Sequence, residues 1–289
     1  AAVDAYAANV YRQIKTYGAI PEDWLAPLTA RAHAQGLRIS GHVPVDGTLT
    51  GALDAGYDEV QHLVFLWLNF AGGPVEKNLT YEAARIARRM GRRSPAMTSL
   101  LARMAAGDMA LDPTLAIYEQ LLTGRKGVLH PAYAALAPRL PPQTLRGALA
   151  GPLPITGDLT QEDLEFLFTA SQALVHKAWE AGVAIAVGTD HRALPGFSYV
   201  RELKLLAEAG IPRAEVLYLA TAGAAELLSV DDRLGTVEVG KRADLVLVRG
   251  NPLESLNALR DIIMVWRDGR GYPAGALETA GGLLPANGP

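Results

Sequence analysis

The chain has 289 residues, of which 49% are hydrophobic and 20% charged, the composition of a soluble globular protein. Its formal net charge of −3 gives no support for a polyanionic partner such as nucleic acid. The absence of cysteine excludes disulfides, thiolate metal sites and cysteine nucleophiles. No apolar run reaches the ~18 residues of a membrane span, so a membrane protein is not expected. The compartment, cytoplasmic or exported, stays open.

Short apolar runs alternate with longer helical patterns, which predicts βα units around a parallel sheet. Strands are expected over residues 10–17, 37–42, 59–63, 109–112 and 183–190. A helix entered at Pro21 is expected after the first strand, and a short helix over 50–55 before the third. A long helical region, about 115–182, precedes the last strand. Its final helix is expected to begin at Thr160, with Asp163 as the capping-box partner.

The pattern changes in the C-terminal third of the chain. Two helices are expected over residues 198–209 and 213–228. They are followed by a turn-linked strand pair over 235–248 and a further strand over 262–270 with an Asp-Gly turn. A tail rich in Pro, Gly and Ala follows Tyr272.

Four polar side chains lie at or near the C-terminal ends of separate predicted strands, namely Lys15, His42, His62 and Asp190. In a parallel α/β barrel these ends converge on one face, where active sites are built. One histidine in such a place is more often a core or loop residue, but four groups on four strands favour a common site. Two neutral imidazoles and a carboxylate suit zinc or a similar divalent ion.

Ordered motifs extend through nearly the whole chain. The upstream motifs are Ile14-Lys15, Gly41-His42-Val43-Pro44, Gln61-His62-Leu63 and Asp112-Pro113-Thr114-Leu115. The downstream motifs are Gly188-Thr189-Asp190, Leu194-Pro195-Gly196-Phe197-Ser198, Arg233-Leu234-Gly235-Thr236, Gly240-Lys241-Arg242-Ala243-Asp244-Leu245-Val246, Asn251-Pro252-Leu253 and Val265-Trp266-Arg267-Asp268-Gly269-Arg270. This set resembles the amidohydrolase superfamily, and most closely its branch of imidazolonepropionase-like enzymes and Xaa-Pro dipeptidases.

The resemblance implies an α/β fold, a partial (β/α)8 TIM-type barrel made of strands four to eight, followed by C-terminal strands of a small β-sandwich. Residues 1–230 would form a metal-dependent hydrolase barrel with a helical insertion at about 115–182. Residues 231–289 would form the sandwich strands and the tail. The insertion is expected to overhang the barrel mouth and to shape the substrate pocket.

The resemblance also implies a role for each candidate residue. Lys15 matches the strand-four lysine, which in binuclear members carries a carboxylate from carbon dioxide and bridges two metal ions. Such a lysine must be neutral to react, which burial beside cations favours. His42 and His62 match ligands of the second metal, and Asp190 matches a ligand of the first. The implied cofactor is one or two divalent ions, with zinc favoured by ligand type.

In the family's mechanism a metal-bound hydroxide attacks a carbonyl, and Asp190 carries the proton to the leaving group. The implied function is hydrolysis of a C–N bond in an amide, cyclic amide or dipeptide. An ester, lactone or phosphoester is an alternative substrate, because the same hydroxide attacks each of them.

The chain departs from the family at the His-x-His signature of the first barrel strand. It has six histidines, and no two are separated by one residue. This departure favours another alternative, a non-catalytic chain that serves as a binding subunit. Five barrel strands are expected rather than eight, so an N-terminal portion or a separate chain is expected to complete the barrel. A homo-oligomer also stays open.

The remaining charged and polar groups are given structural interpretations. His33, His130 and His176 are expected to pack or to face solvent, whereas His191, beside Asp190, suits a substrate contact as well as a structural role. An arginine-rich stretch is expected to be a solvated helix face rather than an anion site. Its members are Arg85, Arg88, Arg89, Arg92 and Arg93.

Overall fold

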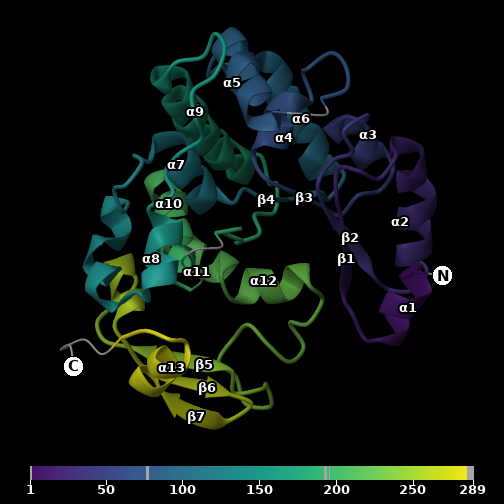
Figure 1. The fold of residues 1–289 in the computed structure, drawn as a ribbon. Coiled ribbons are helices and arrows are strands. Elements are labelled where there is room, and N and C mark those ends of the chain that lie inside the picture. Colours follow the sequence, from purple (N-terminus) through teal and green to yellow (C-terminus); the bar gives the residue numbers. More distant parts are fainter. Residues whose placement is uncertain (1, 76–77, 192–193, 195, 285–289) are drawn as a thin grey trace. The chain divides into compact units, whose positions relative to one another are not determined.

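The computed structural model describes residues 2–75, 78–191, 194 and 196–284 (Figure 1). The chain divides into two compact units that alternate along the sequence. Unit 1 comprises Ala1–Leu115 and Ile155–Ala186, and unit 2 comprises Ala116–Pro154 and Val187–Pro289. The domain boundary expected near residue 230 stays a prediction. Within the described ranges, no helix is both long and apolar enough to cross a membrane.

Unit 1 contains a parallel sheet of four strands in the order β1-β2-β3-β4. The strands are β1 (Gln13–Thr16), β2 (Arg38–Gly41), β3 (Glu59–Gln61) and β4 (Ala110–Asp112). All four were predicted, and each is shorter than expected. The first begins three residues later than predicted because Val10 has a φ of 64°, a left-handed conformation that cannot continue a strand. Ile39, Val60 and Leu111 are fully buried at the centre of the sheet.

The strand expected over residues 183–190 is reduced to a single bridge. Ile185 pairs in parallel with Leu111 of β4. Two hydrogen bonds flank this pair, from Leu111 N to Ala184 O (2.9 Å) and from Ala186 N to Leu111 O (2.9 Å). β4 has only three residues, so it offers little further backbone for pairing. The parallel strands of the described residues therefore form an open sheet, and closure into a barrel is not seen among them.

Eight helical segments of unit 1 are described. They are α1 (Ala2–Ala8), η1 (Glu22–Trp24), α2 (Leu25–His33), α3 (Leu49–Asp54), α4 (Val64–Leu68), α5 (Leu79–Met90), α6 (Pro95–Ala106) and α9 (Gln161–Glu180). The predicted start of α9 is confirmed: the Thr160 hydroxyl accepts a hydrogen bond from Asp163 N, and the Asp163 carboxylate accepts one from Thr160 N. The short helix expected at 50–55 begins one residue earlier, where Thr48 caps it.

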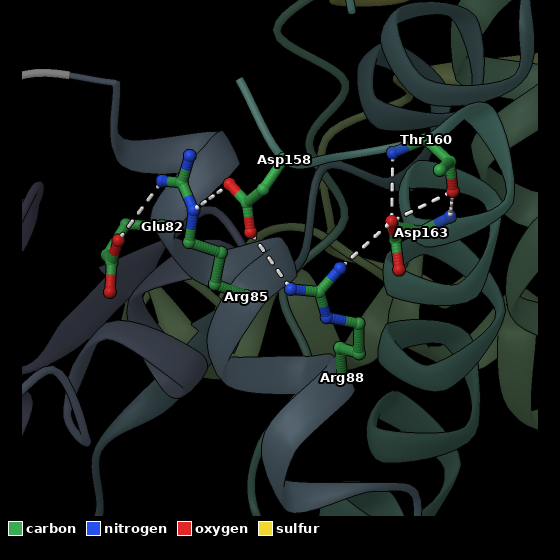
Figure 2. A network of polar contacts seen from close by, with 6 residues as sticks. All are labelled: Glu82, Arg85, Arg88, Asp158, Thr160 and Asp163. Carbon is green, nitrogen blue, oxygen red and sulfur yellow. Dashed lines mark hydrogen bonds and ion pairs between the residues drawn. The ribbon is translucent and has the colours of Figure 1, made fainter. Parts of the chain in front are cut away.

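The arginine-rich stretch joins α5 to the start of α9 (Figure 2). Asp158 accepts hydrogen bonds from Arg85 Nε and Arg88 Nη2, both at 2.9 Å. Arg88 Nη1 lies 3.3 Å from Asp163 Oδ2, so the same arginine reaches the residue that caps α9. Glu82 also belongs to this group of contacts, because its carboxylate accepts a hydrogen bond from Arg85 Nη1 at 3.3 Å. We refer to Glu82, Arg85, Arg88, Asp158, Thr160 and Asp163 as the α5–α9 network. Its charges are paired within unit 1 on an exposed helix face.

Several helices of unit 2 fall in the regions predicted to be helical, 115–182, 198–209 and 213–228. They are α7 (Leu115–Thr123, which begins at the unit boundary), η2 (Pro131–Arg139), α8 (Pro142–Ala148), α10 (Phe197–Glu208), α11 (Arg213–Leu219), α12 (Ala222–Leu227), η3 (Leu256–Arg260) and α13 (Ala274–Ala280). The prediction of one helix over 213–228 is wrong. Thr221 has φ −132° and ψ −91° and separates α11 from α12. Its hydroxyl donates to Leu217 O at 2.6 Å and so closes the first helix.

An antiparallel sheet in unit 2 has the order β5-β6-β7. Its strands are β5 (Leu245–Val248), β6 (Ile262–Arg267) and β7 (Arg270–Pro273). The predicted Asp268-Gly269 turn is confirmed, since both residues have the positive φ that a tight hairpin requires. The strand expected before β5 is absent from residues 235–244, where Gly235 and Gly240 have positive φ and turn the chain. Residues 274–280, expected as a tail, form α13.

Candidate functional site

Three of the four predicted site residues lie at the carboxyl edge of the parallel sheet in unit 1. Lys15 is the third residue of β1, His42 follows β2 directly, and His62 follows β3 directly. The parallel register aligns these strand ends, with Thr16 opposite Gly41 and Gly41 opposite Val60. The sequence argument that these groups converge is therefore supported by the arrangement of the sheet.

The two imidazole rings lie against each other. The ring centroids of His42 and His62 are 4.7 Å apart, and the rings are nearly perpendicular at 85°. On another side, His42 stacks on Tyr17 at 4.0 Å and 27°. Phe65 lies 5.4 Å from the His42 ring. Two aromatic neighbours therefore restrict the His42 ring while it remains beside His62.

A close approach of β1 and β2 brings Lys15 near His42. Gly41 has a φ of 123°, and a Cβ at this position would lie 2.4 Å from Thr16 O and 3.0 Å from Lys15 Cγ. Only glycine permits this approach. The carbonyl of His42 is also held, because it accepts hydrogen bonds from the Tyr57 hydroxyl (3.0 Å) and the Thr16 hydroxyl (3.2 Å).

His62 is buried, with 6% of its surface exposed. Its backbone N–H donates to Asp112 O at 2.8 Å, and its Nδ1 lies 2.9 Å from Thr114 Oγ1. Burial, and after it the charges of His42 and Lys15, lower the pKa of His62 to about 3. The neutral imidazole is the form that binds a metal ion, so this environment favours ligation.

Lys15 differs from the expectation in its exposure. Lys15 Cγ would lie 3.0 Å from a Cβ at Gly41, the residue before His42, but Lys15 is exposed. The burial that would favour a neutral, carboxylated lysine is therefore not seen. Lys15 lies on β1, which is an edge strand of the described sheet.

Asp190 belongs to unit 2 and is exposed. Its φ of 45° places it in the left-handed region, which aspartate tolerates better than most residues. The neighbouring backbone is anchored, because Thr189 Oγ1 accepts a hydrogen bond from His191 N at 3.3 Å. The same oxygen lies 3.4 Å from the hydroxyl of Ser198, a fully buried residue at the start of α10. Asp190 is therefore an exposed residue beside an anchored segment of backbone.

His191 packs inside unit 2 rather than facing solvent. It is 4% exposed, its Nδ1 accepts a hydrogen bond from Leu194 N at 3.3 Å, and its ring lies 5.6 Å from that of Tyr133. Burial lowers the pKa of His191. These contacts favour the structural role over the substrate contact. The other histidines also pair locally: His33 with Asp58, His130 with Glu119 and His176 with Glu180.

The donor set fits a divalent ion in part. Unit 1 supplies two adjacent imidazoles and a nearby lysine. In the part of the chain that the structure describes, no three His, Cys, Asp or Glu side chains cluster closely enough to hold a metal. Among the described residues of unit 1, a modified Lys15 is the candidate for a third ligand. The structure thus brings His42 and His62 together at the strand ends, with Lys15 on the neighbouring strand.

Sequence reasoning gave no role to Gly41 or Thr114, although both stand in the quoted motifs. Gly41 carries a recognisable signal, since it precedes a candidate ligand at a strand end. Thr114 lies two residues beyond β4, where a polar side chain of a parallel sheet can reach the same edge. The pairing of Thr114 with His62 depends on left-handed backbone conformations at both residues, which cannot be predicted from the residue types.

Sequence comparisons point to one family. The model of the amidohydrolase family matches residues 165–271. A segment of 81 residues is 43% identical to 5-methylthioadenosine/S-adenosylhomocysteine deaminase of Desulforudis audaxviator (strain MP104C). The match covers 25% of this chain and 19% of that protein.

Solved structures match over almost the whole chain. A putative prolidase from Bifidobacterium longum is 27% identical with a TM-score of 0.56, covering 94% of this chain and 58% of that one. A bottromycin amidohydrolase has a TM-score of 0.70 at 21% identity, covering 99% of this chain and 62% of that one. The chain therefore spans a little over half the length of these structures.

Proposed function

We propose that the chain belongs to the amidohydrolase superfamily and is part of a metal-dependent hydrolase that cleaves C–N bonds. The observation that carries this proposal is the pair of imidazoles, His42 and His62, with ring centroids 4.7 Å apart at the carboxyl edge of a parallel sheet. Active sites of parallel α/β proteins are built at this edge. Lys15 on the neighbouring strand belongs to the same group.

Lys15, His42 and His62 are the residues that would hold one divalent ion, and Asp190 is the residue that would contribute to a second. Zinc suits imidazole and carboxylate ligands. Such an ion polarises a carbonyl and lowers the pKa of water. The burial of His62 keeps its imidazole neutral across the physiological range, which is the state that ligation requires.

Asp190 is the proposed proton carrier. The residue is exposed and follows Thr189, whose side chain anchors the neighbouring backbone, which supports this role. It would accept a proton from the attacking water and deliver it to the leaving nitrogen. An amine leaves only after protonation, which makes this transfer a requirement for cleavage of a C–N bond.

A dipeptide amide is the proposed substrate. The prolidase, with 27% identity over 94% of this chain, supports it. A second candidate is the removal of an amino group from a purine ring, which is supported by the 43% identical segment of a deaminase. Both reactions break a C–N bond, and the four candidate residues serve either substrate.

The proposed fold of the intact protein is a barrel, of which the described sheet supplies strands four to seven and the Ile185 bridge marks strand eight. The antiparallel sheet of unit 2 would belong to a β-sandwich. A further segment or chain would supply the preceding strands. Among the described residues β1 is an edge strand of the sheet, which supports this, because an edge strand is a site for strand addition.

The test is hydrolysis by the zinc-loaded chain of Xaa-Pro dipeptides and, in parallel, of aminopurine nucleosides. We expect Asp190→Asn to lower kcat by about 10²–10⁴-fold, the usual contribution of a general acid–base group. Asp268→Asn is the matched control, because Asp268 is also exposed and has a positive φ of 51°. Equal activity of Asp190→Asn and wild type would remove the proton role. A zinc-loaded chain without activity on either substrate would remove the claim that this chain is catalytic by itself.

A further inference from the structure

Thr114 and His62 form a buried side-chain pair at the carboxyl edge of the sheet in unit 1. Thr114 is 2% exposed and His62 is 6% exposed. Thr114 Oγ1 lies 2.9 Å from His62 Nδ1, a normal hydrogen-bond distance. At this depth a polar atom is expected to have a partner, and each side chain provides one for the other.

Both residues of the pair have unusual backbone conformations. His62 has a φ of 74° and Thr114 a φ of 49°. The left-handed region is uncommon for any residue with a Cβ and rare for a β-branched one such as threonine. Strained backbone of this kind persists where the surrounding structure fixes it, and it is concentrated at functional sites. Two strained residues joined by a side-chain hydrogen bond indicate a built arrangement rather than an incidental contact.

The strand ends determine how the two side chains meet. β3 and β4 pair up to Gln61 opposite Asp112. The chains continue side by side beyond the strands, with a hydrogen bond from His62 N to Asp112 O (2.8 Å) and another from Leu63 N to Pro113 O (3.3 Å). This alignment places the residue two positions after β4 opposite the imidazole.

We propose that Thr114 is a positioning residue that holds His62 in the tautomer with its proton on Nδ1. In that tautomer Nδ1–H donates to the Thr114 hydroxyl, and Nε2 carries the lone pair that a metal ion would use. A ligating histidine generally donates its second ring N–H in this way, which fixes both the tautomer and the ring orientation. This inference rests on the proposed metal site and adds to it a residue outside the ligand set.

The alternative to this proposal is the tautomer of His62 with its proton on Nε2. If the Thr114 hydroxyl donates to Nδ1, the proton is on Nε2, and that nitrogen cannot bind a metal. A neutral imidazole has one donor and one acceptor nitrogen, so only one of the two arrangements holds at a time. The direction of a single hydrogen bond therefore decides whether Thr114 supports ligation or opposes it.

The experiment uses the full chain and two variants of the pair. Thr114→Val removes the hydroxyl but keeps the β-branched shape, so the backbone constraint at φ 49° is unchanged. Thr114→Ser keeps the hydroxyl. Thr29→Val is the matched control, because Thr29 is equally buried, lies on α2, and bonds only to backbone carbonyls in the described contacts.

Two readouts are measured. The ¹⁵N chemical shifts of the His62 ring in the metal-free chain report its tautomer, and competition with a chelator reports zinc affinity. We expect the Nδ1–H tautomer in the wild type, Thr114→Ser and Thr29→Val, and its loss in Thr114→Val. Zinc affinity is expected to fall about 10–100-fold in Thr114→Val, the usual effect of losing such a partner. It should stay close to wild type in the other two variants.

A wild-type chain with the proton of His62 on Nε2 would overturn the proposal. Undiminished zinc affinity of a folded Thr114→Val chain would overturn it as well. If Thr114→Val does not fold, the ring shifts of the wild type still decide the direction of the hydrogen bond. If the wild type binds no zinc, the proposed metal site fails, whereas the tautomer measurement still tests Thr114 separately.

Discussion

At the scale of single residues, the candidate site depends on small groups that are not themselves ligands. Gly41 permits β1 and β2 to approach so closely that a Cβ would lie 2.4 Å from a backbone oxygen of β1. Backbone atoms cannot move aside as a flexible side chain can. A larger residue would therefore have to separate the two strands that carry Lys15 and His42.

We expect Gly41→Ala to destabilise unit 1 and to weaken zinc binding. The left-handed backbone alone costs an alanine about 1 kcal/mol or more, and the clash with Thr16 O adds to it. Gly36→Ala is the control, because Gly36 has a φ of 69° and nothing within 4 Å of its Cβ position. Urea unfolding and zinc titration should show a clearly larger loss for Gly41→Ala. Equal losses would mean that the close approach at Gly41 is not important.

At the scale of elements, the α5–α9 network illustrates how charge supports a helix start. The hydrogen bonds from Arg85 and then Arg88 hold the pKa of Asp158 below its ordinary value. The Thr160 backbone N–H is the first cause of a lowered pKa at Asp163. Carboxyl groups with a lowered folded-state pKa stabilise the fold above their unfolded pKa of about 3.9 and lose that contribution as the pH falls through the folded value.

We therefore expect Asp158→Asn to destabilise the chain at neutral pH and to have little effect in strong acid. Urea unfolding of wild type and variant, at neutral pH and below pH ~3, measures the difference. The network is exposed, so added salt should also reduce the difference. An effect of Asp158→Asn that is equally large in acid would show that its origin is not the ionised carboxylate.

The sequence predicted those elements whose signals are local. The Thr160 capping box, the Asp268-Gly269 turn and the four parallel strands are each marked by residue types within a short window. The predictions failed where the decisive feature is a backbone conformation. Thr221 divides the predicted helix 213–228, although threonine occurs inside many helices. Residues 235–244 have a strand-like composition, but glycines at 235 and 240 turn the chain instead.

At the scale of the whole molecule, the candidate site was predicted in part. Lys15, His42 and His62 converge because parallel strand ends share an edge, which follows from chain order alone. The exposure of Lys15 was not predictable, since it depends on what covers β1. Asp190 lies in the second compact unit, and the division between units falls inside the segment read as one strand. Nor could the sequence show that Thr114 would pair with His62.

The measurement that tests the central claim most directly is the zinc content of the purified, zinc-exchanged chain by elemental analysis. The wild-type chain is compared with the variants His42→Asn and His62→Asn. His33→Asn is the control, because His33 pairs with Asp58 and is not part of the imidazole pair. We expect at least about one equivalent in the wild type and the control, and a loss in both site variants, since a zinc site needs its ligands. A well-folded wild-type chain without zinc, or site variants that retain it, would contradict a metal site at His42 and His62.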